Sequence, residues 1–276
     1  MPPWTRESAT AEPGWRPGIP GLLLCLPAIL LGLLAPAIAP WNPAVIAGSA
    51  LLPPSSAHWM GTDPLGRDLL SGVIFGARAS LLVAGAVGMI AFIIGAAIGT
   101  LAGYRGGRID DLLMRITEFF QVIPRFFLAI LTIALFGPGL DRVVVVLGLT
   151  SWPLLARVIR ADVLALKEQD FVLASRAAGA SGWRIVIHEL LPNALPGALV
   201  VLGLLLGQVL LVEASLGFIG LGDPNTVTWG GLAGQAIPFL RVAWWLPLFP
   251  GLALGLTVLG LNLLADAATG ALQDDR

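Results

Sequence analysis

The chain has 276 residues, of which 57% are hydrophobic and only 12% are charged, and its mean hydropathy is +0.87. A soluble domain carries about 25% charged residues because its surface must face water, so lipid must be the solvent for much of this chain. The formal net charge of −1 argues against a nucleic acid as partner. The single cysteine, Cys25, excludes an internal disulfide and a cysteine metal cluster.

Long apolar stretches predict an all-α, polytopic membrane protein with about six spanning helices, since each crossing needs about 20 mostly apolar residues. Two stretches are weaker, because 119–136 contains Arg125 and 143–159 contains Pro153. Five spans is therefore the alternative count. The short turn 137–139, which is Gly-Pro-Gly, is typical of a helical hairpin joining these two. The clear stretches are 19–39, 79–103, 196–216 and 246–266.

The first apolar stretch also has features of a secretory signal peptide. Arg6 and Arg16 precede it, and its end at 37–39 fits a cleavage site. Pro40 disfavours cleavage, and the run is longer than a signal peptide requires, so we expect it to remain as the first span. The expected organisation is a cytoplasmic tail 1–18, a span 19–39, an extracytoplasmic loop 40–78, and a transmembrane domain 79–276 that includes a cytoplasmic loop 161–193.

The distribution of Lys and Arg predicts that both termini lie in the cytoplasm, because cytoplasmic loops collect positive charge. Trp244 and Trp245 then lie at the outer mouth of the last span, where aromatic rings settle at headgroup level. The inside set is Arg6, Arg16, Arg105, Arg108, Arg115, Arg157, Arg160, Lys167, Arg176, Arg184 and Arg276, and the outside set is Arg67, Arg78, Arg142 and Arg241.

Motifs for catalysis and nucleotide binding are incomplete. A P-loop ends in Gly-Lys-Ser/Thr, but the only lysine, Lys167, lacks these neighbours. His188 begins like a zinc protease motif, but the second histidine is replaced by Pro192. Ser181 has the flanking glycines of an intramembrane serine protease, but it lies in a basic loop. We expect no catalytic residues, no metal site and no cofactor.

Polar residues inside predicted spans are candidates for function, because charge in hydrocarbon is costly. Glu213 and Asn262 either line a path or gate, or form hydrogen bonds between helices, and Asp266 fits simple placement at the interface. Small residues four apart let helices approach closely. The glycines with this spacing are Gly95, Gly99 and Gly103 in one span and Gly251 and Gly255 in another.

The loop 161–193 is too polar to span and too apolar to be a tether. Asp170 is a candidate N-cap for a short helix 171–178, Gly179 permits a turn, and 183–191 reads as a second helix before Pro192 begins the fifth span. Exposed apolar surface on such a pair favours a docked partner. The alternative is a pair that lies on the lipid headgroups.

This loop resembles the coupling loop of ABC importer permeases, in which Glu-Ala-Ala is followed after three residues by Gly and then, nine residues later, by Ile-x-Leu-Pro. Here Leu173 stands in place of the glutamate, so the acid for which the motif is named is absent. The resemblance assigns contact with an ATPase to this loop, and the candidate residues are Asp170, Ala174, Arg176, Gly179, Leu191 and Pro192.

Further stretches resemble the shorter permease of dipeptide and oligopeptide importers. They are 61–68, 76–81, 213–222, 229–230, 248–251 and 262–266, and the resemblance covers about residues 20–272. It implies a type I ABC importer permease fold, with Glu213 and Asn262 as candidates for the translocation path.

The same resemblance implies the partners. They are a homologous second permease, two cytoplasmic ATPases that hydrolyse ATP in place of this chain, and an extracytoplasmic substrate-binding protein, all at a bacterial inner membrane. The family handles peptides, nickel, glutathione and other solutes, and peptide is the default expectation. The rival hypotheses are a secondary transporter, which should show inverted repeats that this sequence does not display, and a membrane enzyme.

Overall fold

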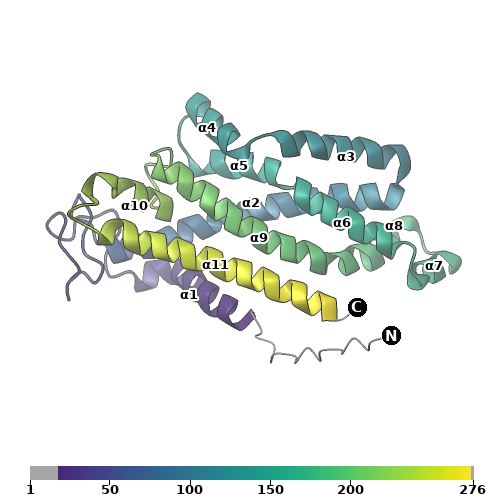
Figure 1. The fold of residues 1–276 in the computed structure, drawn as a ribbon, viewed down its shortest axis with the longest axis horizontal. Helices are drawn as coiled ribbons and strands as arrows, with labels where there is room; N and C mark the ends of the chain where they lie inside the picture. The colour runs from purple at the N-terminus through teal and green to yellow at the C-terminus, as the bar shows by residue number, and fades with distance from the viewer. Residues whose placement is uncertain (1–17, 275–276) are drawn as a thin grey trace, which may run out of the picture.

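The structure is a computed structural model that describes residues 18–274. Nearly all of the predicted tail 1–18, with Arg6 and Arg16, and also Arg276 lie outside the described residues. The described chain is an elongated bundle of helices (Figure 1), with isolated bridges at Ile46–Arg67 and Thr62–Asp68 as its extended pairings. The elements are α1 (Gly18–Ile38), α2 (Leu69–Arg105), α3 (Gly107–Val122), α4 (Arg125–Phe136), α5 (Leu140–Ser151), α6 (Pro153–Leu166), α7 (Asp170–Ala177), α8 (Gly182–Ile185), the π-helical turn η1 (Val186–Leu190), α9 (Leu191–Phe218), α10 (Trp229–Gln235), the 3-10 turn η2 (Ile237–Phe239) and α11 (Trp245–Asp274).

Five helical stretches of the described chain are long and apolar enough to cross a membrane, and α3 with α4 makes six if that bent pair counts as one span. The prediction of an all-α membrane protein with about six spans is confirmed. The span predicted over 119–136 is broken within that range, because α3 and α4 meet at 71°. Pro124 explains the break, since it lacks an N–H and forces Ile123 into an extended conformation.

The second span begins at Leu69 rather than at residue 79, so residues 69–78 of the predicted loop are helical. Asp68 starts this helix, because its carboxylate accepts hydrogen bonds from the Ser71 amide at 2.8 Å and the Ser71 hydroxyl at 2.7 Å. As a result, Arg78 lies within the helix and not in a loop. The fourth span is also longer than predicted, since α5 and α6 run together over residues 140–166.

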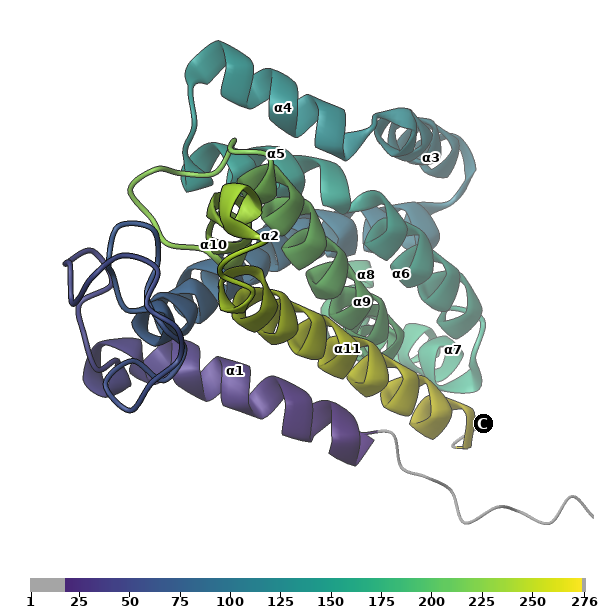
Figure 2. The ribbon, with the colours of Figure 1, turned by 60° about the vertical axis from the view of Figure 1, so that its left-hand side comes forward.

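The two ends of the bundle differ in what they carry. One end holds α7, α8, the start of α1 and the C-terminal end of α11, while the loop before α2 and the helix α10 lie at the other (Figures 1 and 2). A Cβ atom placed on Gly18 would lie 3.4 Å from the Cβ of Ala267, so α1 begins beside the end of α11. An even number of crossings brings the first and last helices to the same side in this way.

Close packing of α2 on α6 explains the predicted glycine stripe. A Cβ on Gly95 would lie 2.7 Å from the Cβ of Leu155, and one on Gly103 would lie 2.9 Å from the Arg160 carbonyl oxygen. A side chain at these positions would push the helices apart. Gly251 and Gly255 differ, because no described atom lies within 4 Å of the position a Cβ would take.

Candidate functional site

Helix α7 projects from one end of the bundle and is held there by one buried side chain and by the residues just before it. Val172 is fully buried in the main core together with Ile185 of α8 and Leu190 of η1. The Lys167 ammonium group, just before α7, donates a hydrogen bond to the Gly103 carbonyl oxygen at 3.1 Å, which ties the loop to the end of α2. These contacts make α7 part of the folded bundle and not a tether.

The turn after α7 depends on Gly179, whose φ of +81° lies in the left-handed region that favours glycine. The turn closes by two backbone hydrogen bonds, from Gly179 to the Arg176 carbonyl and from Ala180 to the Ser175 carbonyl, both at 3.0 Å. A Cβ on Gly182 would overlap the Tyr104 hydroxyl, so α8 approaches α2 closely. The angle between α7 and α8 is therefore set by backbone geometry.

The surface of α7 is polar at its ends and apolar between them. Phe171 and Leu173 are 43% and 45% exposed. Leu173, which stands where the coupling motif that this loop resembles has glutamate, therefore adds apolar surface instead of charge. The predicted contact residues Asp170, Ala174, Arg176 and Gly179 are all exposed on α7 or in its turn. The prediction that Asp170 is the N-cap is wrong, because Gln169 occupies that position and Asp170 is the first helical residue.

The other two predicted contact residues lie elsewhere. Leu191 and Pro192 begin α9, beyond the π-helical turn, and Leu191 is half-buried. The segment from Gly182 to Phe218 is continuous enough to be one span, so Pro192 does not mark where the helix starts. The Asn193 amide group donates a hydrogen bond to the Glu189 carbonyl oxygen at 2.6 Å, beside the position where proline lacks a donor. Helices α8 and α9 are thus parts of one continuous helical segment.

Glu213 lies near the opposite end of α9 and is only 2% exposed. The Ser80 hydroxyl of α2 donates to its carboxyl group at 3.1 Å, and the Trp229 amide at the start of α10 lies 3.4 Å from the same hydroxyl. A Cβ on Gly230 would overlap the backbone of Ala214. Glu213 therefore joins α9 to α2 and, through the Ser80 hydroxyl, to α10, which is the kind of contact that the hydrogen-bonding alternative describes.

Asn262 lies on α11, on the side that faces α9, and is half-buried. Its side-chain oxygen lies 3.5 Å from the position that a Cβ on Gly207 would take. Asp266, one turn further along, is exposed. The structure does not bring Asn262 together with Glu213, so the two predicted path residues do not form one site.

The loop before α2 is a compact cap built by the stretch 61–68. The Arg67 guanidinium pairs with the Asp63 carboxylate at 2.5 Å, and the His58 ring lies 2.9 Å from Asp68. The Trp245 indole nitrogen donates to the Thr62 carbonyl oxygen at 3.4 Å, which holds the cap against α11. The stretch 61–68 thus orders the loop and starts α2.

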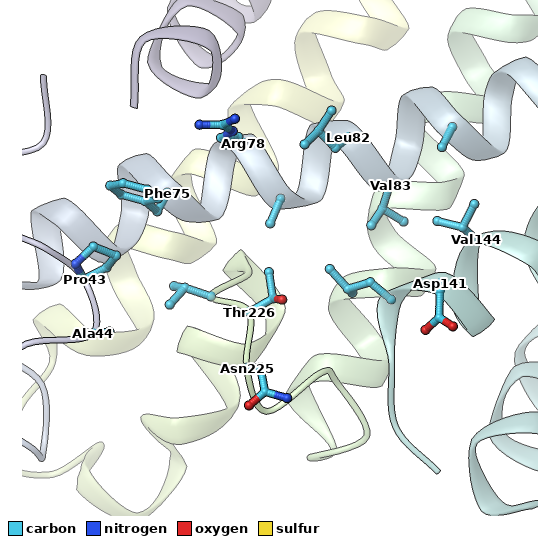
Figure 3. Close-up of a pocket in the computed structure, with 14 residues that line it drawn as sticks. Pro43, Ala44, Phe75, Arg78, Leu82, Val83, Asp141, Val144, Asn225 and Thr226 are labelled. Carbon is cyan, nitrogen blue, oxygen red and sulfur yellow. The ribbon is translucent and has the colours of Figure 1, made fainter. Parts of the chain in front are cut away.

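A cavity of about 540 Å³ lies between α2, the start of α5 and the loop between α9 and α10 (Figure 3). Phe75, Leu82 and Val83 supply apolar lining from α2. The polar lining comes from Arg78, Asp141, Asn225 and Thr226. Sequence reasoning assigned Arg78 to a loop and gave no role to the other three, because only the fold brings these distant segments together.

Comparison with known proteins agrees with the fold. Residues 95–275 match the family of binding-protein-dependent transport system inner membrane components. The chain is 38% identical over 257 residues to the dipeptide transport system permease protein DppC of Bacillus subtilis, covering 91% of this chain and 80% of that protein. It is 34% identical over 254 residues to the oligopeptide transport system permease protein OppC of the same organism, covering 91% and 83%.

A third relative is the di/tripeptide permease protein DppC of Pseudomonas aeruginosa, which is 38% identical over 260 residues and covers 91% of this chain and 86% of that protein. Among solved structures, a chain from inward-facing conformations of the MetNI methionine ABC transporter matches with a TM-score of 0.57 and 24% identity. That match covers 74% of this chain and 96% of the other, and it supports the fold alone. The chain belongs to the binding-protein-dependent transport system inner membrane components, and it is a non-catalytic permease subunit of an ABC importer.

Proposed function

We propose that this chain is one of two homologous permeases in a bacterial inner-membrane importer of short peptides. Two cytoplasmic ATPases dock on the coupling loops of the permease pair, the loop of this chain being α7–α8, and a substrate-binding protein delivers solute at the opposite end. The single observation that carries the proposal is the position of α7, which is exposed at one end of the bundle and rigidly joined to its core through Val172.

Positive charge supports the orientation. Arg105 ends α2, Lys167 follows α6, and Arg176 and Arg184 lie on α7 and α8, so the positive charge at this end supports a cytoplasmic position for it. Both ends of the described chain lie there too. The cap formed by residues 39–68 and α10 then faces the extracytoplasmic side, where a binding protein would dock.

The loop has the mechanical properties that coupling requires. A displaced α7 carries α8 with it, because the turn at Gly179 is closed by backbone hydrogen bonds. α8 continues through η1 into α9, and α9 reaches the outer end, where Glu213 holds α2 and α10. Closure of the ATPases on α7 would therefore move a helix that spans the whole bundle.

Peptide is the proposed substrate because the three relatives named above are dipeptide, di/tripeptide and oligopeptide permeases. ATP hydrolysis takes place on the separate ATPase subunits. In this scheme the chain contributes the path and the coupling surface.

The proposal is tested by placing a bulky charge on the exposed face of α7. Ala174→Glu should abolish co-purification of the ATPases and ATP-dependent peptide uptake in proteoliposomes, while membrane insertion stays normal. Ala268→Glu is the matched control, because Ala268 is also exposed near the same end but lies on α11. Undiminished ATPase binding and uptake in Ala174→Glu would refute docking at α7.

A further inference from the structure

The cavity between α2, α5 and the α9–α10 loop carries two charged side chains on its rim, Arg78 and Asp141, which come from different helices. Figure 3 places Arg78 at the upper rim on α2 and Asp141 across the cavity at the start of α5. Asn225 and Thr226 form the opposite wall from Arg78. The remaining lining is mainly apolar, with Phe75 and Val144 among its members.

Neither the Arg78 guanidinium nor the Asp141 carboxylate has an ion-pair partner within the described chain. No hydrogen bond or ion pair joins Arg78 or Asp141 to another side chain of residues 18–274, although Arg67 and Arg160 of the same chain are both paired. Both side chains are exposed. Arg78 also borders a second groove toward α1, but the other residues that line it carry no polar side chain to accept a hydrogen bond from a guanidinium group.

The cavity continues toward the extracytoplasmic end. A second cavity of about 330 Å³, lined by Asp63, Arg67 and Gln235 among others, shares five lining residues with the first. The shared residues are Pro43, Ala44, Asn225, Thr226 and Val227. Polar groups thus lead from the cap at the end of the bundle to an apolar chamber beside α2.

We propose that the chamber lined by Arg78, Asp141, Asn225 and Thr226 is the outer solute site of this permease, and that it binds the two charged termini of a short peptide. This inference rests on the proposed function as a peptide importer and adds the position and chemistry of the site.

The chemistry of the lining selects a zwitterion with apolar side chains. The Arg78 guanidinium matches a terminal carboxylate, because a planar fork of donors binds two carboxylate oxygens at once. Asp141 matches the terminal ammonium group, and the Asn225 amide and Thr226 hydroxyl match peptide N–H and C=O groups. The apolar walls take the side chains. A volume of about 540 Å³ is within the usual range for small-ligand sites.

The test uses the complete importer in proteoliposomes with saturating, preloaded binding protein, so that the affinity of that protein does not enter. The probe is a photoreactive dipeptide of alanine and p-benzoylphenylalanine, and its C-terminal amide is the matched analogue. Cross-linked residues are located by mass spectrometry. The variants are Arg78→Gln and Arg78→Lys, with Arg241→Gln as a control because Arg241 is exposed near the same end but lines neither cavity.

In the wild type we expect labels on lining residues such as Val83 or Val144. Arg78→Gln should lower labelling and uptake of the free-carboxylate peptide about tenfold, the effect of losing one charged hydrogen bond. Arg78→Lys should restore most of it, the amide should respond little to either variant, and Arg241→Gln should behave as wild type. Asp141→Asn should weaken labelling of the free-amine peptide but not of its N-acetyl form.

Three results would overturn the site. The first is cross-linked label found only on residues outside the chamber, and the second is unchanged labelling in Arg78→Gln. The third is an equal loss of labelling for the peptide and its amide, together with lower recovery of the second permease, which would mean that the second permease fills the chamber. In each of these the wild type still imports peptide, so the proposed function stands. Absence of ATP-dependent uptake of any peptide by the wild type would overturn the proposed function and the site together.

Discussion

The turn at Gly179 allows a sharp test of whether the geometry of the α7–α8 loop transmits force. Gly179 has a φ of +81°, and no described atom lies within 4 Å of the position of a Cβ, so Gly179→Ala adds backbone strain without a clash. A residue with a Cβ costs about 1–2 kcal/mol in the left-handed region. If the turn relaxes to relieve this strain, α7 swings away from its orientation and Val172 leaves the core.

Gly107 supplies the matched control, because it has a φ of +55°, has no atom within 4 Å of a Cβ position, and lies at the same end of the bundle but outside the loop. Both variants should lose a similar amount of stability. Only Gly179→Ala should weaken ATPase binding, by about 5- to 30-fold, the factor that corresponds to the strain. The assay is titration of purified ATPase onto the permease pair in nanodiscs. Equal affinities for the two variants would refute the reasoning.

Two further expectations concern the bundle itself. Gly99→Leu should prevent close packing of α2 on α6 and lower the Tm of the purified protein steeply, because even a Cβ would overlap a backbone carbonyl of α6. Gly85→Leu on the same helix is the control, since its side chain meets open space and should leave the Tm nearly unchanged. Similar Tm values for the two variants would contradict this packing. Ser80→Ala removes the hydroxyl that joins Glu213 to α10 and should cost about 1–2 kcal/mol, measured by thermal unfolding in detergent. Ser215→Ala is the control, since that hydroxyl bonds only within its own helix, and an equal loss in both would contradict the network.

Apolar length and small-residue spacing predicted the bundle well. Lipid as solvent requires long apolar helices, so five of the crossings are visible as hydropathy alone. The stripe at Gly95, Gly99 and Gly103 predicted a close helix contact, and the structure places α6 against it. What hydropathy misses is the break at Pro124, because residues 119–136 form an apolar run that continues across it, and α3 and α4 pass as a span only when they are taken together.

The candidate site was predicted only in part, for a physical reason that differs at each end. At α7 the local sequence pattern was enough to predict a short helix followed by a turn, because Gly179 permits the turn and Leu173 stands in the stretch that resembles the coupling motif. At the α10 end the fold brings together residues far apart in the chain: Ser80 donates to Glu213, and Arg78 and Asp141 line one cavity. No local pattern reports such pairs, and only Glu213 was found, because a carboxyl group in an apolar run is conspicuous.

The central claim is that α7 contacts the ATPases while the cap formed by residues 39–68 faces the other side of the membrane. The chain has one cysteine, Cys25, which is buried in α1, so Cys25→Ser gives a background without cysteine. The measurement is bifunctional cross-linking in membranes from a single cysteine at either end. We expect Ala174→Cys to cross-link to an ATPase and Ile46→Cys, at a position that is 71% exposed, to cross-link only to the binding protein. Cross-linking of an ATPase through Ile46→Cys and not through Ala174→Cys would contradict both the orientation and the coupling role.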